Sequence, residues 1–198
     1  DWAEEGLDAE AEAGETLEAG LDESLDDAAP PSLPAGNYFG LQQEMLSALV
    51  AYGQDAVLPI VQGIDLYIME DDARQALRRI KPEPDALLAA WNTAEGQAQV
   101  ILLEFMSGLD DPRIHELLLD LLGEYDEALV DGAVEALRHL PSPPVSRLLG
   151  LLQGPSPEHS AGAARVLGLL PASDEIVQAL ISNLGAENSL VREQAVIA

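Results

Sequence analysis

Histidines, which could carry out acid–base or metal chemistry, are few and scattered along the sequence. The 198-residue chain contains three histidines, His115, His139 and His159, and no cysteine. Metal-binding histidines usually occur three or four residues apart on one helix or converge with carboxylates, whereas each of these lies on a different predicted helix. We therefore expect no metal centre and no cofactor, and we interpret the histidines as exposed helix residues.

Adjacent acidic residues are the second candidate for catalysis, because paired carboxylates can act as general acid and base. Within the predicted folded domain such pairs include Asp71-Asp72, Asp110-Asp111, Asp126-Glu127 and Asp174-Glu175. All stand at or near the starts of predicted helices, where anionic side chains accept hydrogen bonds from free N–H groups and complement the helix dipole. We interpret them as helix caps. The sequence also has no phosphate-binding loop and no nucleophile motif, which favours a non-enzymatic function.

Charge is distributed very unevenly. The chain has 36 acidic residues against nine Lys and Arg, a formal net charge of −27, and no basic residue precedes Arg74. A field of this sign repels nucleic acid and anionic lipid and attracts cationic partners. We therefore expect neither nucleic-acid binding nor membrane insertion. The second expectation also follows because no apolar run approaches the roughly 20 residues that a membrane span needs.

The first 36 residues form a segment of their own. They contain twelve carboxylates and no base, and they end in the proline-rich stretch Pro30–Pro34. This composition buries too little apolar surface to offset the entropy lost on ordering. We predict a disordered acidic tail and linker over residues 1–36, followed by a folded domain over residues 37–198.

The folded domain repeats itself every 31 residues. The same apolar pattern, closed by a glycine, occurs three times, at residues 114–123, 145–154 and 176–185. A second repeated pattern relates Ala73–Ile80 to Ala133–Leu140. A fixed period of this length indicates stacked supersecondary units that cannot bury their apolar faces alone. Because Leu and Ala dominate the apolar residues, we predict an all-α fold, an α-solenoid of stacked antiparallel helix pairs.

Glycine and proline divide the domain into a first helix, which begins near Tyr38 and is closed by Gly53, and five helix pairs. The predicted pairs are 55–64 with 65–80, 85–92 with 95–109, 111–123 with 128–140, 144–154 with 158–170, and 174–185 with 189–198. Gly123, Gly154 and Gly185 should adopt the left-handed conformation that follows many helices. Leu118, Leu149 and Leu180 occupy equivalent positions in the period, so each should be buried.

Two short motifs connect the chain with known repeats. The stretch Ala56–Val61 resembles the Ala-Val-Pro-x-Leu start of an outer helix, with Leu58 inserted before Pro59, and Leu190–Ala195 resembles the Val-Arg-x-x-Ala signature of an inner helix. Both are features of the HEAT-repeat family, particularly of the short bacterial repeats of the bilin-lyase type. The resemblance implies a stack over residues 38–198 in which the second helix of each pair lines a concave inner face.

Most basic residues fall on the second helices of the predicted pairs. The HEAT resemblance implies that they form a broken row along the concave face. We predict that this row contacts the partner, through Arg74, Arg78, Arg138, Arg165 and Arg192. The alternative is that these arginines are solubilising residues paired with nearby acids such as Glu135, each pair contributing little to stability.

These features together predict a non-enzymatic scaffold or adaptor that binds another protein or peptide on the concave face. The alternative that the resemblance implies is a bilin-lyase-like enzyme, or enzyme subunit, that handles a chromophore and its acceptor protein. The lack of cysteine fits a reducing compartment, so we expect a cytoplasmic, bacterial protein. Because the chain starts at Asp1 rather than Met and stops within a predicted helix, we interpret it as a fragment and leave a removed signal peptide open.

Overall fold

The computed structural model describes residues 38–64 and 68–198, with the side chains from Glu44 onwards. The predicted acidic tail over residues 1–36 therefore lies outside the described residues, as does Asp65, where the second helix of the first pair was predicted to begin. Residues Phe39–Ala198 form one compact unit.

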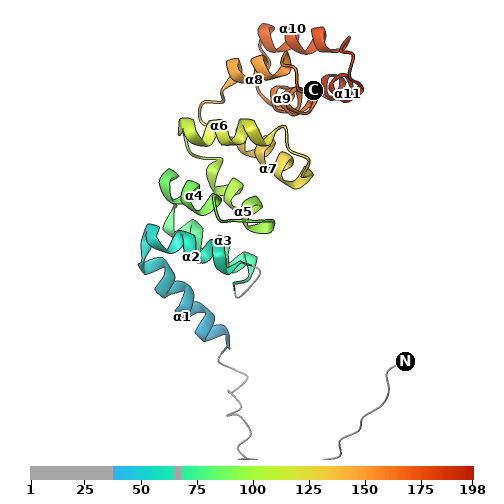
Figure 1. The fold of residues 1–198 in the computed structure, drawn as a ribbon. Coiled ribbons are helices and arrows are strands. Elements are labelled where there is room, and N and C mark those ends of the chain that lie inside the picture. The colour runs from blue at the N-terminus through green and yellow to red at the C-terminus, as the bar shows by residue number, and fades with distance from the viewer. Residues whose placement is uncertain (1–37, 65–67) are drawn as a thin grey trace, which may run out of the picture. The chain divides into compact units, whose positions relative to one another are not determined.

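The described regular structure is almost entirely helical (Figure 1). Beyond the helices, the described residues contain one isolated bridge between Ile64 and Ile68. The prediction of an all-α fold is therefore confirmed. The helices are α1 (Tyr38–Ala51), α2 (Val57–Gly63) after a 3₁₀ turn at Gly53–Ala56, α3 (Glu70–Ile80), α4 (Pro84–Trp91), α5 (Gln97–Met106), α6 (Pro112–Leu121), α7 (Glu127–Arg138), α8 (Val145–Leu152), α9 (Pro157–Leu169), α10 (Asp174–Asn183) and α11 (Ser189–Ile197).

From α2 onwards the helices pack as successive pairs in two layers. Within each pair the two helices contact each other, α2 with α3, α4 with α5, α6 with α7, α8 with α9 and α10 with α11. The second helices also contact one another in sequence, from α3 through α5, α7 and α9 to α11. We call these five helices the second-helix layer, and α2, α4, α6, α8 and α10 the first-helix layer. The arrangement is the predicted α-solenoid of stacked helix pairs (Figure 1).

The core follows the 31-residue period. Leu118, Leu149 and Leu180 are 0, 8 and 9% exposed, as the repeat predicts. Small residues fill the core side of the second helices, where Ala133, Ala163 and Ala164 are fully buried. Small side chains allow helix axes to approach closely, so a domain with few aromatic residues can still exclude water from its interior.

Helix starts carry the signals expected from the sequence. The carboxylates of Asp111 and Asp126 accept hydrogen bonds from the backbone N–H groups of Arg113 and Ala128, at 2.8 and 2.9 Å. Both residues are therefore N-caps, as interpreted from their positions. Asp71 and Asp174 lie in the first turns of α3 and α10. Among the described helices, none is both long and apolar enough to cross a membrane.

The three period-closing glycines do not take the predicted left-handed conformation. In the part of the chain that the structure describes, positive φ angles occur at Gly53, Gly96 and Lys81. At Gly123 and Gly154 the backbone N–H instead bonds to the carbonyl three residues earlier, at 3.2 and 3.0 Å. Such bonds tighten the last turn and pair its free carbonyl groups, so no left-handed residue is needed there.

Candidate functional site

The three histidines do not come together. His115 lies on α6, His139 caps α7 and His159 lies on α9. Within residues 38–64 and 68–198, no group of three or more His, Asp or Glu side chains could hold a metal ion. Only His139 is exposed, so the interpretation of all three as exposed residues is wrong for the other two.

Local packing explains why two of the histidines are half-buried. The side chain of His115 is 15% exposed, and its Nε2 atom lies 3.3 Å from the Asp110 carboxylate. The ring of His159 packs against Gly123, where a Cβ atom would lie only 1.9 Å from a ring carbon. The absence of a side chain at residue 123 thus makes room for a histidine of the following repeat.

A serine, a histidine and a glutamate do meet at the start of α9. The Ser156 hydroxyl lies 2.9 Å from Nδ1 of His159 and donates to the Glu158 carboxylate over 3.1 Å. The same hydroxyl accepts the backbone N–H of His159, which makes Ser156 the N-cap of the helix. Because the hydroxyl is held by its own helix, the arrangement is a helix cap.

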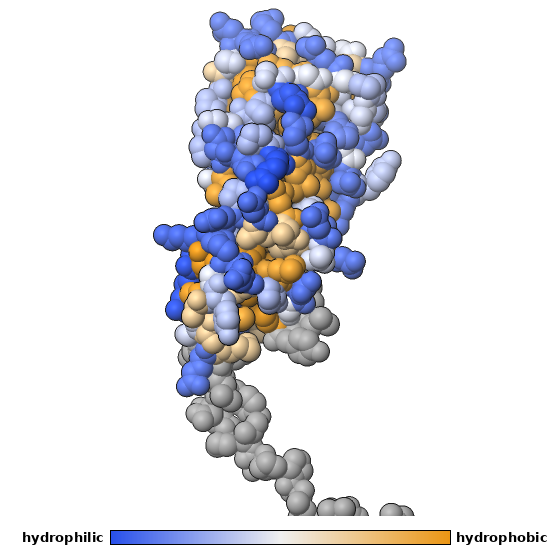
Figure 2. Space-filling view, turned by 60° about the vertical axis from the view of Figure 1, so that its left-hand side comes forward, coloured by the Kyte–Doolittle hydropathy of each residue, from blue (hydrophilic) through white to orange (hydrophobic). Residues whose placement is uncertain are grey.

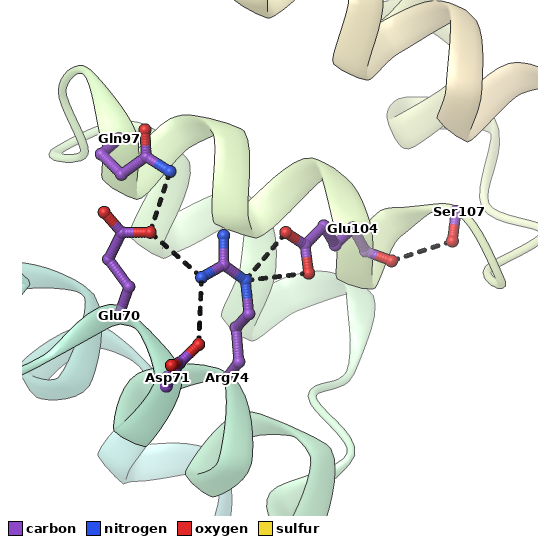
Figure 3. Close-up of polar contacts among 6 residues, drawn as sticks. All are labelled: Glu70, Asp71, Arg74, Gln97, Glu104 and Ser107. Carbon is purple, nitrogen blue, oxygen red and sulfur yellow. Dashed lines mark hydrogen bonds and ion pairs between the residues drawn. The ribbon is translucent and has the colours of Figure 1, made fainter.

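Arg74, the first residue of the predicted arginine row, lies within a polar cluster that joins α3 to α5 (Figure 3). Its Nε atom donates to both Glu104 oxygens, at 2.9 and 3.2 Å, and its Nη1 atom donates to Glu70. Gln97 donates to the same Glu70 oxygen. The bond to Glu104 raises the pKa of Arg74 above its ordinary value. This guanidinium therefore links two neighbouring helices of the second-helix layer.

Other arginines link neighbouring repeats in the same way. Three arginines, one in the second-helix layer and two in the first-helix layer, each pair with an acid on the preceding helix of the same layer. Arg165 on α9 pairs with Asp131 on α7 in the second-helix layer. In the first-helix layer the pairs are Arg113 with Asp85, at 2.7 Å, and Arg147 with Glu116, at 2.6 Å.

The remaining members of the predicted row have different surroundings. Arg138 pairs with Glu135 on its own helix, at 3.3 Å. Arg192 donates to the backbone carbonyls of Ala186 and Glu187 and so holds the turn between α10 and α11. Arg78 is exposed, and no ion pair with another described residue involves it. The structure places all five arginines on second helices but brings them into no common cluster.

A groove with a volume of about 410 Å³ lies on the second-helix layer between α7, α9 and α11. Its floor is apolar and consists of Leu122, Val130, Ala161, Gly162 and Leu190. Its rim carries the carboxylates of Glu124, Glu127 and Glu158, together with Tyr125 and Arg165. Figure 2 shows apolar surface between hydrophilic side chains on one face of the molecule. We call the groove lined by these residues the α7/α9/α11 groove.

Sequence reasoning did not single out this groove. Its lining residues run from Leu122 to Gln194 and meet only when three repeats stack. One local signal was available, because Tyr125 is a large aromatic residue between acids in the turn before α7. Its side chain is 92% exposed.

A second, smaller recess lies beside the first on the same layer. It has a volume of about 250 Å³ and lies between α5 and α7, where Glu104, Glu135 and His139 are its titratable lining residues. The second-helix layer thus presents successive hollows with apolar floors and mainly acidic edges.

Comparison of the sequence with models of known protein families and with curated proteins finds no match to this chain.

Proposed function

We propose that the chain is a non-enzymatic HEAT-like scaffold that binds another protein or peptide on its second-helix layer. The observation that carries this proposal is the α7/α9/α11 groove. It opens on that layer, has an apolar floor, and is built by three successive repeats. Apolar clefts with a few polar groups at their edges are the usual sites for peptide and ligand binding.

The framework beneath the groove suits a binding role. Ion pairs between repeats, such as Arg74–Glu104 and Arg165–Asp131, fix neighbouring second helices relative to each other. A surface that is already ordered loses less entropy when a partner binds, which favours affinity. In this proposal most arginines of the row position the surface. Arg78 is the strongest candidate for direct contact with a partner.

The proposal is tested by site-specific photo-crosslinking in the full chain. A photoreactive phenylalanine analogue replaces Tyr125 or Glu135 in the second-helix layer, and Asp120 or Gln178 in the first-helix layer. All four side chains are exposed, so the fold should tolerate the replacement. After illumination in an extract of the cells that produce the protein, one shared partner should be crosslinked from the second-helix positions only. Equal crosslinking from both layers would contradict the assignment of the binding face.

A further inference from the structure

We propose that the α7/α9/α11 groove binds a short cationic segment of another protein, with Lys or Arg side chains at the rim and an apolar side chain on the floor. This inference rests on the proposed scaffold function and names the chemistry of the partner. It differs from the expectation drawn from the arginine row, which would suit an anionic partner.

The charge of the rim is the first argument. Three carboxylates, those of Glu124, Glu127 and Glu158, face one guanidinium, that of Arg165. Asp131 already pairs with Arg165, so the only cation of the rim is neutralised within the chain. The negative rim therefore attracts cationic side chains and repels anionic ones.

The partial positive charges at two helix starts offset part of the negative charge of the rim. Glu127 and Glu158 lie in the first turns of α7 and α9, where they offset the partial positive charge of the helix starts. Asp126 and Ser156 already cap those two starts through their side chains. Glu124 belongs to neither helix and precedes the Asp126 cap. The rim thus keeps a net negative charge after the dipoles are counted.

Tyr125 is the second argument. This residue is 92% exposed at the edge of a groove whose floor residues Leu122 and Ala161 are 1 and 5% exposed. An aromatic ring in water beside carboxylates can stack on a guanidinium or receive an ammonium group over its face. Tyrosine is also one of the residue types enriched among the side chains that dominate the binding energy of protein interfaces.

The apolar floor of the groove favours a peptide over a simple cation as the ligand. Leu190 on the floor of the groove is 42% exposed, and Gly162 contributes no side chain to the floor. A recess of about 170 Å³ continues past Arg165 and Gln194 toward Leu169. A metal ion would gain nothing from this apolar surface, whereas a Leu or aromatic side chain between cationic residues would bury it.

The test measures binding of a labelled eight-residue peptide that alternates pairs of arginines with single leucines, by fluorescence anisotropy with the full chain. Residues 1–36 carry twelve carboxylates and would also attract such a probe. The test therefore compares the affinity of each variant for the probe with that of the unmodified chain. Glu124→Gln with Glu127→Gln should weaken binding roughly fivefold to tenfold. Tyr125→Ala should weaken it roughly tenfold. The effect of the glutamine pair should shrink between 0.1 and 1 M salt, where the Debye length falls from about 10 to about 3 Å.

The matched control is Glu95→Gln with Asp120→Asn, which changes the net charge equally at two exposed carboxylates that do not line the groove. This variant should bind the probe within about twofold of the unmodified chain. Equal effects of the two double variants would overturn the proposal, as would equal binding of a probe with serine in place of leucine. In either case, retained crosslinking from the second-helix layer would leave the scaffold function standing, with a partner of different chemistry.

Discussion

The Asp111 carboxylate has two roles at the start of α6. It caps the helix by accepting the Arg113 backbone N–H, and it binds the Arg113 guanidinium through both oxygens, at 3.1 and 2.9 Å. The hydrogen bonds from the Arg113 side chain are the main cause that lowers the pKa of Asp111 to about 2, from an ordinary value of 3.8. A carboxylate with a lowered pKa stabilises the folded state above its unfolded pKa, and it loses that contribution as the pH falls through its folded pKa.

A pH-dependent effect of Asp111→Asn follows from this residue. Asparagine retains the cap but not the charge, so the variant should melt at a lower temperature than the unmodified chain near neutral pH. The difference in melting temperature should shrink as the pH falls from about 4 to about 2, because the Asp111 carboxylate of the unmodified chain then becomes protonated and, like asparagine, carries no charge. Melting temperatures measured across this range provide the check. In an Arg113→Gln background the substitution should lose most of its effect; an unchanged effect would show that the stabilisation does not come from the Arg113 guanidinium.

Single residues also show what the sequence could predict about the site. The placement of Arg74 and Arg165 on second helices was predictable from the repeat pattern. Their partners were not, because Glu104 and Asp131 lie 30 and 34 residues away on the neighbouring second helix. The Asp111 and Asp126 caps were predictable because a cap bonds to residues two positions along the same chain.

At the scale of the helix, glycines mark where elements approach each other. Gly162 on α9 faces Leu122, and a Cβ atom at this position would lie 2.8 Å from the Leu122 carbonyl oxygen. Backbone atoms cannot move aside as a flexible side chain can, so the two elements would have to separate. The sequence suggested conformational roles for several glycines. The structure shows that Gly123 and Gly162 serve mainly as points of close packing between repeats.

Two glycine substitutions of opposite sign test this account. Gly162→Ala should destabilise the fold by roughly 1–3 kcal/mol, because the new methyl group overlaps Leu122. Gly150→Ala in the middle of α8 should stabilise it by about 0.4–1 kcal/mol, because no atom lies within 4 Å of the added Cβ and alanine restricts the unfolded chain. Chemical denaturation of both variants measures the two changes. A stabilising Gly162→Ala would show that α9 does not pack on Leu122 this closely.

At the scale of the whole molecule, the 31-residue period together with the glycine and proline breaks was enough to predict the order and pairing of the helices. Equivalent leucines recur at 118, 149 and 180, and each is buried. The α7/α9/α11 groove was not predictable in the same way, because its shape depends on how far three second helices separate. A periodic sequence fixes which faces are buried, but surface hollows depend on side chains that do not follow the period, such as Tyr125.

A stack in which each pair contacts mainly its neighbours should respond differently to central and terminal cavities. Leu118 in α6 is fully buried in the middle of the stack, whereas Leu180 lies in α10, in the last described pair. Leu118→Ala should cost roughly 2–5 kcal/mol and reduce amide protection on both sides of the substitution. Leu180→Ala should release mainly α10 and α11 and leave protection in α2 to α5 close to that of the unmodified chain. Hydrogen exchange read by mass spectrometry resolves the two patterns, and a uniform loss of protection in Leu180→Ala would show one cooperative globule in place of a stack of repeats.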